Sequence, residues 1–471
     1  MTGIEQRMDM AKRASQDYYR LKFHIMPEGG WLNDPNGLIQ YKGKYHVFYQ
    51  HNPYAPERGP LHWGHVDSDD LMHWNYLPFA LTADQYYEKK CFSGSAVDNN
   101  GELTLIYTAH DLTRSPKEVQ CVAFSNDGIN FKKYENNPVI KAPPPGFDEE
   151  FRDPKVLKYN DLWYMVVGCS SDNRGGINLY SSKDLRHWEY KGMACKSDGT
   201  QGDMWECPDL FKLENLWVIA TSPMKMKNSK CIFITGDMDF NACSFTQKQW
   251  RDVDYGYDFY APQTFEDAKK RRIMIAWMGM WGEEIPTIKN GWAGALTVPR
   301  ELFLQKGEVW QKPVEEISFL RKKELFKGTV QLNAGSEGNL KSVTGDCLEL
   351  KFTIPVNDKN HGKLHLYLRT SKDKKERSVL IYDFTEKCFI YDKRNSGAGR
   401  NAENRLPSVD WKDEIPVHVI IDRSSVEIFL YGGKYAVTNR IYPQPSSLFY
   451  DLVADGIDIK IQNFQAWYLD V

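Results

Sequence analysis

The chain has 471 residues, more than one hydrophobic core usually holds, which favours two domains. Its formal net charge is -3 at pH 7, and lysines and arginines are scattered among aspartates and glutamates, which argues against nucleic acid as a partner. Because no 18 apolar residues follow one another and the N-terminus lacks the apolar run of a secretory signal, we expect no membrane association.

The nine cysteines are an odd number and show no C-x-x-C spacing. This pattern argues against both a zinc site and a disulfide framework. We therefore predict a reducing, cytoplasmic environment.

Residues 1–20 are charged and predict an N-terminal extension that includes one helix. Most of the remaining chain reads as short strands separated by Gly, Asn, Asp and Pro turns. A repeat runs through the first half, because Ser68, Ser125 and Ser182 lie 57 residues apart and each begins a segment that ends in an aromatic residue six positions later. We expect these aromatics to pack the repeats together; they are Trp74, Phe131 and Trp188.

A second repeated element is a β-rich run after a small polar turn. Its five copies are YKGKYHVFYQ, GELTLIYT, YNDLWYMVVG, LENLWVIAT and RRIMIAWMG. Strand-rich repeats of this size are typical of propeller blades, which bury their faces against their neighbours. A solenoid or tandem sandwich domains would also repeat, but five copies that then stop favour a closed five-bladed β-propeller over residues 21–310.

The pattern changes after the last copy. Residues 311–325 predict a linker with a short helix, and residues 326–471 alternate apolar and polar side chains, as in KLHLYLRT and VHVIIDRSSVEIFLYG. Alternation without intervening helices indicates a half-solvated antiparallel sheet, so we predict a C-terminal β-sandwich. The fold class is therefore all-β.

Five polar residues share one place in the repeats, just ahead of the β-rich run: Asp34, Ser93, Asp153, Glu206 and Asp258. The innermost strands of a propeller line its axial channel, so equivalent positions on different blades converge there. We therefore expect four acids and a serine to face one another in one pocket.

Each of these residues has a structural explanation when it is taken alone. Asp34-Pro35-Asn36-Gly37 is a turn sequence, and Asp153-Pro154 reads in the same way. Their shared position in the repeats favours a functional role instead. Like charges close together are costly unless they take part in chemistry or bind a cation. Two carboxylates about 5 to 5.5 Å apart support retaining glycoside hydrolysis. Aromatic side chains could form apolar walls for sugar rings: Trp31, Trp63, Phe92, Trp205 and Trp292.

An ordered series of motifs covers nearly the whole chain: WLNDPNG, WGHVDSDDLMHW, FSGS, FRDPKV, WECPDL, DYGYDFYAPQTF, WAGALTVPREL and IDRSSVEIF. The series resembles glycoside hydrolase family 32, which contains invertases, levanases and sucrose-6-phosphate hydrolases. The resemblance implies a five-bladed propeller joined to a sandwich, a small carbohydrate substrate and no metal or organic cofactor. It leaves a monomer and a homodimer open.

The resemblance also implies roles for individual residues. Asp34 would be the nucleophile, Glu206 the acid/base, and Asp153 a stabiliser of the oxocarbenium-like transition state. Arg152 would hold Glu206 or a sugar hydroxyl. The expected substrate contacts are Trp31, Asn33, Gln50, Trp63, Phe92, Ser93, Arg152 and Trp292.

One position departs from the family pattern. The family usually shows a tryptophan eight positions after the residue that corresponds to Gln50, whereas this chain has Arg58. A guanidinium group suits phosphate oxygens, so Arg58 is a candidate phosphate contact for sucrose 6-phosphate. A solvated loop residue is an equally good interpretation.

Three other functions remain open at this point. A carbohydrate-binding protein on a decayed enzyme scaffold would have lost one of the three acids, and this chain keeps them all. An inverting pentoside hydrolase is disfavoured by the DPNG and IDRSSVEIF elements. Transfructosylation would use the same residues as hydrolysis.

Overall fold

The structure is a computed structural model that describes residues 3–227, 229–338, 340–356, 360–412 and 414–471. It is mostly β, and its one α-helix in these ranges is α1 (Gly3–Ser15), inside the predicted N-terminal extension. No helix among the described residues is long and apolar enough to cross a membrane. All nine cysteines are unpaired.

Five sheets follow one another along residues 30–313, and we call them the five-sheet ring. The first contains β1 (Gly30–Tyr41), β2 (Lys44–Asn52), β3 (His62–Ser68) and β4 (Asn75–Leu81), with the short β19 (Trp292–Ala293) parallel to β1. The second contains β5 (Lys90–Asn99), β6 (Glu102–His110), β7 (Glu118–Ser125) and β8 (Lys132–Lys133). The third contains β9 (Phe151–Tyr159), β10 (Leu162–Ser171), β11 (Arg174–Ser182) and β12 (Glu189–Lys196). The fourth contains β13 (Trp205–Leu213), β14 (Leu216–Pro223), β15 (Ile232–Asp239) and β16 (Ser244–Asp252), and the fifth β17 (Tyr260–Glu266), β18 (Arg272–Trp277), β20 (Arg300–Gln305) and β21 (Glu308–Pro313).

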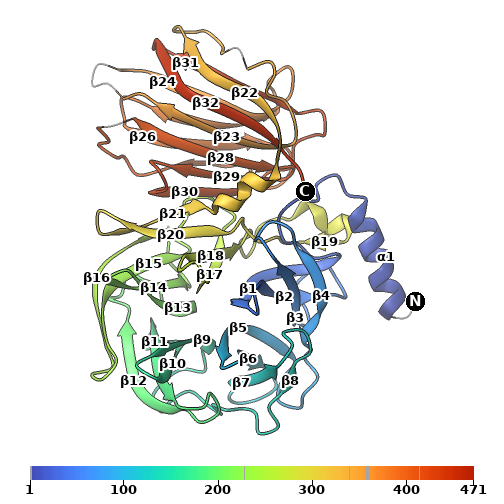
Figure 1. Cartoon of the computed structure of the whole chain (residues 1–471), viewed down its shortest axis with the longest axis vertical. Helices are drawn as coiled ribbons and strands as arrows, with labels where there is room; N and C mark the ends of the chain where they lie inside the picture. Colours follow the sequence, from blue (N-terminus) through green and yellow to red (C-terminus); the bar gives the residue numbers. More distant parts are fainter. Residues whose placement is uncertain (1–2, 228, 339, 357–359, 413) are drawn as a thin grey trace.

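The first strands of the five sheets surround a common axis. In order, β1 contacts β5, β5 contacts β9, β9 contacts β13 and β13 contacts β17, while β17 returns to β1 (Figure 1). The ring is therefore closed, and residues far apart in the sequence come together at its centre. The five repeated β-rich runs are the second strands, β2, β6, β10, β14 and β18.

The 57-residue repeat corresponds to one turn that recurs after the third strand of three sheets. In the first copy the Asp70 carboxylate accepts hydrogen bonds from the backbone N–H groups of Met72 and His73. Asp127 and Asp184 do the same for the residues two and three positions after them. The repeated sequence therefore encodes an Asx turn. The repeated aromatics are partly buried against the hydrophobic clusters of the sheets, as predicted for Trp74, Phe131 and Trp188.

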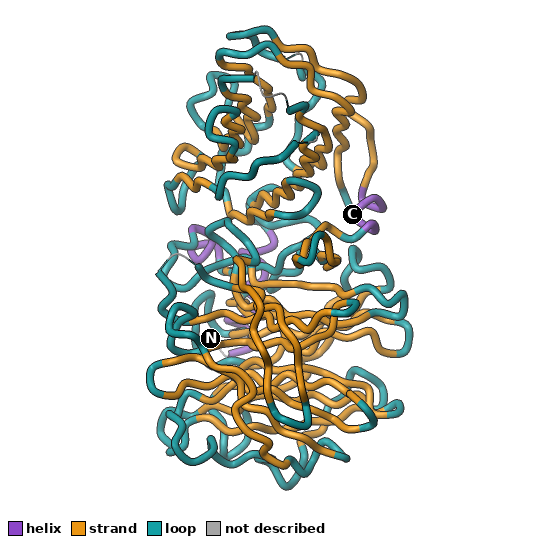
Figure 2. The backbone as a smooth tube through the Cα atoms, turned by 90° about the vertical axis from the view of Figure 1, so that its left-hand side faces the viewer, coloured by secondary structure: helices purple, strands orange, loops and turns teal. Residues whose placement is uncertain are grey.

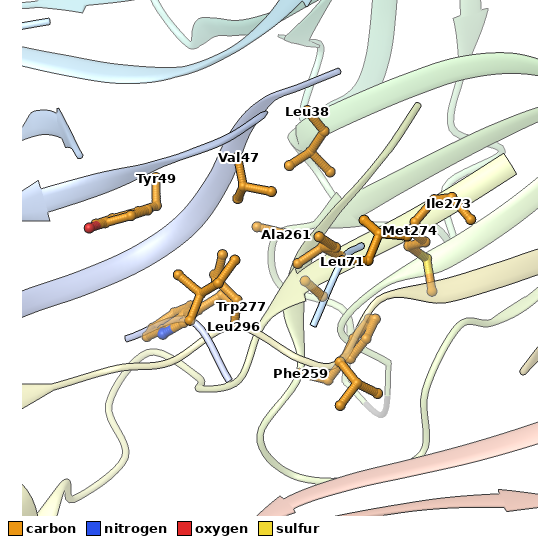
Figure 3. Close-up of a cluster of buried hydrophobic side chains, with 14 of the residues drawn as sticks. Leu38, Val47, Tyr49, Leu71, Phe259, Ala261, Ile273, Met274, Trp277 and Leu296 are labelled. Carbon is orange, nitrogen blue, oxygen red and sulfur yellow. The ribbon is translucent and has the colours of Figure 1, made fainter. Parts of the chain in front are cut away.

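A large hydrophobic cluster closes the ring between its first and last sheets. Figure 3 shows Leu38 and Val47 of the first sheet in the same cluster as Ala261, Ile273 and Trp277 of the fifth. Each fully buried aliphatic side chain of this kind contributes about 1.5–3 kcal/mol. The cluster therefore supplies the free energy that keeps β1 beside β17.

The C-terminal part, which we call the two-sheet unit, lies above the ring (Figures 1 and 2). One sheet has the order β22 (Arg321–Leu332), β32 (Ile459–Leu469), β23 (Cys347–Ile354), β28 (Ile415–Asp422), β29 (Ser425–Leu430) and β30 (Tyr435–Arg440). The other has the order β27 (Glu403–Arg405), β26 (Cys388–Asn395), β25 (Arg377–Asp383), β24 (Lys363–Thr370) and β31 (Phe449–Asp455). A continuous hydrophobic cluster fills this unit.

The connection between the two parts is shorter than the predicted linker. The last ring strand, β21, ends at Pro313, and β22 of the two-sheet unit begins at Arg321. A 3-10 helix, η2 (Glu315–Leu320), lies between them, so the segment 311–325 contains the ends of two strands.

A buried ionic network joins the ring to the two-sheet unit. Arg300 is fully buried and donates to Asp254 at 3.0 Å and to Glu427 at 2.6 Å. Glu427 and Asp422 in turn bind the two ring nitrogens of His24, at 2.9 and 2.8 Å. Burial lowers the pKa of His24, but these hydrogen bonds outweigh burial and raise it to about 9. The network therefore sets two cations of the N-terminal segment and ring against three carboxylates, two of which belong to the two-sheet unit.

We expect Arg300→Met to lower the free energy of unfolding by about 3–5 kcal/mol, because Glu427 and Asp254 would remain buried without their cation. Chemical denaturation measures this loss. Arg13→Met is the matched control, since Arg13 pairs with Asp9 on the exposed face of α1. Equal stability of the two variants would contradict a stabilising role for the network.

Candidate active site

All five first strands lose their regular register at the same level of the ring. The irregularities lie at 32–35 in β1, 91–94 in β5, 152–155 in β9, 206–209 in β13 and 260–263 in β17. A bulge redirects the side chains around it, so five bulges at one level turn their residues toward the axis.

Three of the bulges share one pattern, a residue with positive φ followed by proline. Asp153, Cys207 and Ala261 have φ values of 65°, 46° and 51°. They lie 54 residues apart, and so do the residues before them, Arg152, Glu206 and Tyr260. The side chains of these three preceding residues form a hydrogen-bonded chain inside the ring, with Glu206 in the middle.

Asp34 lies in a set of three hydrogen-bond donors. Its Oδ1 accepts from Asn33 at 3.1 Å, and its Oδ2 accepts from Gln50 at 3.1 Å and from Ser93 at 2.6 Å. The Trp31 indole donates to the Asn33 amide at 2.7 Å and so fixes its orientation. These donors favour the ionised carboxylate and hold it in one position.

Glu206 is held between a cation and a phenol. Arg152 donates to Oε1 at 3.1 Å, and the Tyr260 hydroxyl donates to Oε2 at 2.5 Å. Burial and the charge of Glu206 raise the pKa of Tyr260 well above its usual value, so Tyr260 stays protonated and donates. Glu118 binds the other side of the Arg152 guanidinium at 3.1 and 3.2 Å.

Asp153 and Asp34 approach the same residue. The Cys207 backbone N–H donates to Asp153 Oδ2 at 2.8 Å, and the Cys207 thiol lies 3.5 Å from that oxygen and 3.6 Å from Asp34 Oδ2. Cys207 therefore bridges the two carboxylates.

The shared burial of these acids raises their pKa values. Burial is the main cause for Asp34, and the charge of Glu206 adds to it, while the bonds from Ser93 and Asn33 act in the opposite direction. Burial, with contributions from Glu206 and Asp34, raises the pKa of Asp153 to about 8 although Arg152 lowers it. Perturbed acids in one pocket are typical of catalytic sites.

One pocket at the centre of the ring collects most of the predicted site residues, and we call it the central pocket. Its lining residues are Asn33, Asp34, Gln50, Arg58, Phe92, Arg152, Asp153, Glu206, Tyr260 and Trp281. Phe92 and Trp281 are its apolar walls. The Arg58 guanidinium lies 4.9 Å from the Trp281 ring centre and 5.7 Å from that of Phe92.

Other predicted residues lie outside this pocket. Trp63 is fully buried and donates to the Phe92 carbonyl, and Trp292 is fully buried and donates to Asp17 beneath the N-terminal segment. Neither can contact a ligand here, because their large rings fill the packing between elements instead. Trp205 is also fully buried. Trp31 and Ser93 do not line the pocket. Trp31 donates a hydrogen bond to Asn33, and Ser93 donates one to Asp34.

Asp258, the fifth residue of the predicted group, points away from the pocket. Its carboxylate accepts from the Arg440 backbone N–H at 2.8 Å, which belongs to the two-sheet unit. The expected meeting of four acids is therefore wrong: three acids meet, and Tyr260 occupies the place expected for Asp258. The 54-residue interval between the bulge prolines would have identified Tyr260, whereas no sequence signal points to Trp281 or Glu118.

Within the described ranges, no group of three or more His, Cys, Asp or Glu residues has a geometry that could hold a metal ion. The carboxyl groups of the pocket are suited to proton transfer and nucleophilic attack.

Family models match both parts of the chain. Residues 24–313 match the glycosyl hydrolases family 32 N-terminal domain, and residues 316–468 match the glycosyl hydrolases family 32 C-terminal model. Sucrose-6-phosphate hydrolase from Zymomonas mobilis is 38% identical, over 95% of this chain and 91% of that protein. Raffinose invertase from Escherichia coli is 35% identical, over 99% of this chain and 100% of that protein.

Solved structures are similar over the same length. A beta-fructofuranosidase from Bombyx mori has a TM-score of 0.84 and 32% identity, covering 99% of this chain and 98% of that one. A mutant of that enzyme was solved in complex with sucrose. Sucrose-6-phosphate hydrolase from Lactobacillus gasseri has a TM-score of 0.86 and 26% identity, covering 99% of this chain and 96% of that one.

We expect Asp153→Asn to stabilise the chain, and to stabilise it more at pH 8 than at pH 5. An unfolded aspartate ionises near pH 4, whereas Asp153 in the fold ionises near pH 8, so the wild type loses stability as pH rises through that window. The pKa shift sets a ceiling of about 1.4 kcal/mol for each unit between the unfolded and folded pKa values. We expect a gain of about 1–3 kcal/mol at pH 8, which is less than the full shift would allow.

Denaturation curves at both pH values measure the gain. The control is Asp237→Asn, an exposed residue on β15. A gain that is equal at both pH values would show that burial does not perturb Asp153.

Proposed function

Because this chain belongs to glycoside hydrolase family 32 and is an invertase-like hydrolase, we propose that its central pocket cleaves the β-fructofuranosidic bond of sucrose, sucrose 6-phosphate or short fructo-oligosaccharides. The observation that carries the proposal is the convergence of Asp34, Asp153 and Glu206 in one pocket. Cleavage retains the configuration at the anomeric carbon and passes through a covalent fructosyl-enzyme.

In this mechanism Asp34 is the nucleophile. Its three donors hold the carboxylate still and support its charge, and Phe92 gives the same pocket an apolar wall. Asp34 attacks the anomeric carbon of the fructosyl unit and forms an ester, and water later cleaves that ester.

Glu206 is the acid and then the base. It protonates the leaving glycosidic oxygen while Asp34 attacks, and it takes a proton from water in the second step. Arg152 and Tyr260 each hold one of its two oxygens, and Glu118 holds Arg152. Arg152 is therefore a positioning residue as well as a group that a sugar hydroxyl can reach.

Asp153 stabilises the transition state. Its Oδ2 is occupied by the Cys207 N–H, which leaves Oδ1 for the ring hydroxyls of the fructosyl unit. Once Asp153 is ionised, a charge-assisted hydrogen bond of this kind contributes about 1.5–3 kcal/mol.

We assign the architecture in the same way. The five-sheet ring is a five-bladed β-propeller and the two-sheet unit is a β-sandwich, which Figure 1 and the strand orders support. The nine free cysteines suit a reducing compartment such as the cytoplasm.

We expect Glu206→Gln to slow fructosyl-enzyme formation on sucrose by about 10²–10⁴-fold, since the variant cannot donate a proton. Azide should partly rescue the second step when an activated fructoside supplies the first. Stopped-flow measurement of both steps tests this. Glu189→Gln, an exposed change on β12, is the control. Unchanged sucrose turnover would remove Glu206 from the role.

Among the proposed substrates, the position of Arg58 favours sucrose 6-phosphate as a second candidate beside sucrose. It lies at the rim of the central pocket, held over Trp281 and Phe92, and no described carboxylate forms an ion pair with it. A fixed cation at the rim suits a phosphate on the leaving sugar.

We expect Arg58→Ala to lower the ratio of kcat/KM for sucrose 6-phosphate over kcat/KM for sucrose by about tenfold, the effect of losing one charge-assisted bond. Product assays with both substrates give the ratio. Arg13→Ala on α1 controls for loss of charge. If the ratio does not change, Arg58 does not contact phosphate.

A further inference from the structure

A second cavity lies on the axis of the ring, at the end opposite to the central pocket, and we call it the rear cavity. All five first strands line it, through Leu38, Val97, Leu157, Phe211 and Phe265. These residues follow the central-pocket residues of the same strands by four or five positions, which is about 13 Å or more along a strand. The volume of the rear cavity is about 660 Å³, within the range of small-molecule sites.

A buried ion pair separates the two cavities. Lys155 donates to Asp209 at 2.9 Å, and the Thr264 backbone N–H donates to the same oxygen at 2.5 Å. Lys155 follows Asp153 by two residues on β9, and Asp209 follows Cys207 by two residues on β13. The two cavities share no lining residue, so the rear cavity is a compartment of its own.

Positive charge exceeds negative charge around the rear cavity. Its basic lining residues are Lys155, Lys158, Lys212, Lys270 and Arg272, against the acids Asp98 and Glu266. Lys155 is paired with Asp209, and Lys270 with Glu266 at 2.9 Å. No described carboxylate forms an ion pair with Lys158 or Lys212, whose ammonium groups remain available.

Arg272 adds a further unused donor. Its guanidinium lies 5.1 Å from the Phe211 ring centre, its Nε is buried without a hydrogen-bond partner among the described residues, and its nearest carboxylate, Glu266, is 3.8 Å away. Burial lowers the pKa of Arg272. A buried donor without a partner costs about 1–3 kcal/mol, and an anion beside it would recover part of that cost.

The remaining wall is aromatic. Trp163 and Trp217 border the cavity, and the Lys158 ammonium lies 5.2 Å from the Trp163 ring centre. Two lysines and an arginine around a partly apolar chamber match a compact, multiply charged anion with a small organic or inorganic body.

We propose that the rear cavity binds a small phosphate-bearing anion, at a site separate from the one that hydrolyses the substrate. The phosphate group takes charge-assisted hydrogen bonds from Lys158, Lys212 and Arg272. This inference goes beyond the proposed function and does not depend on it, because none of its residues belongs to the central pocket.

The test is isothermal titration of the full chain with inorganic pyrophosphate at pH 7. We expect one site whose affinity falls at least about tenfold in the double variant Lys158→Ala/Lys212→Ala, which removes two charge-assisted contacts. Both lysines are exposed, so the variant should fold. Saturating fructose, which the proposed function assigns to the central pocket, should leave pyrophosphate binding unchanged.

Two control variants show whether binding requires these particular lysines or only positive charge on the chain. Lys323→Ala/Lys327→Ala removes the same charge from exposed positions of β22 and should keep the affinity. Arg58→Ala should also keep it, because Arg58 belongs to the central pocket. The proposal is overturned if the wild type binds no pyrophosphate, if the Lys158/Lys212 variant binds as tightly as the wild type, or if fructose displaces the anion. Repeating the titration with inorganic phosphate and with glucose 6-phosphate then distinguishes a free anion from a sugar phosphate as the preferred ligand.

Discussion

The contact between β1 and β17 is the constraint on which the active site depends. Asp34 lies on β1 and Tyr260 on β17, and these strands are separated by more than 200 residues of chain. The hydrophobic cluster between the first and last sheets holds them side by side (Figure 3). Loop-closure entropy opposes such a distant contact, and burial of many aliphatic and aromatic side chains offsets it. Without this closure Asp34 and Glu206, the proposed nucleophile and acid/base, would have no common pocket.

The bulges in the five first strands direct the polar side chains of the closed ring into the central pocket. A regular strand would turn alternate side chains outward, whereas each bulge directs a short group of residues toward the axis. Asp153 and Cys207 adopt positive φ there, a conformation that non-glycine residues rarely take and that costs about 1–3 kcal/mol each. Burying three acids together adds electrostatic cost. The stability of the surrounding sheets offsets both the backbone strain and the electrostatic cost. This is the usual relation between a scaffold and its active site.

The two-sheet unit contributes to the ring although it supplies no residue of the central pocket. Its Glu427 pairs with Arg300 of the fifth sheet, Glu427 and Asp422 both bind His24, and the Arg440 backbone N–H donates to Asp258. The fifth sheet, which carries Tyr260 and Arg300, and Asp258 just before it are therefore tied to the two-sheet unit at two points. Along the axis, the Lys155–Asp209 pair plays a comparable role, because it lies between the acids of the central pocket and the basic rear cavity.

The sequence by itself determined the repeat, the β-rich class and the three acids. The alternation of apolar and polar side chains and the recurring Asx turns are local properties of the chain. Ser68, Asp70 and their repeats can therefore be recognised from the sequence before the fold is known. Only the tertiary structure decided which side chains reach the pocket. Trp63 and Trp292 fill the packing between elements, and Asp258 turns to the two-sheet unit. Trp281 reaches the pocket from the segment after β18, and Glu118, at the start of β7, holds Arg152 without lining the pocket. Side-chain direction at a bulge depends on how five strands meet around the axis, and the spacing of residues along one chain does not contain that geometry.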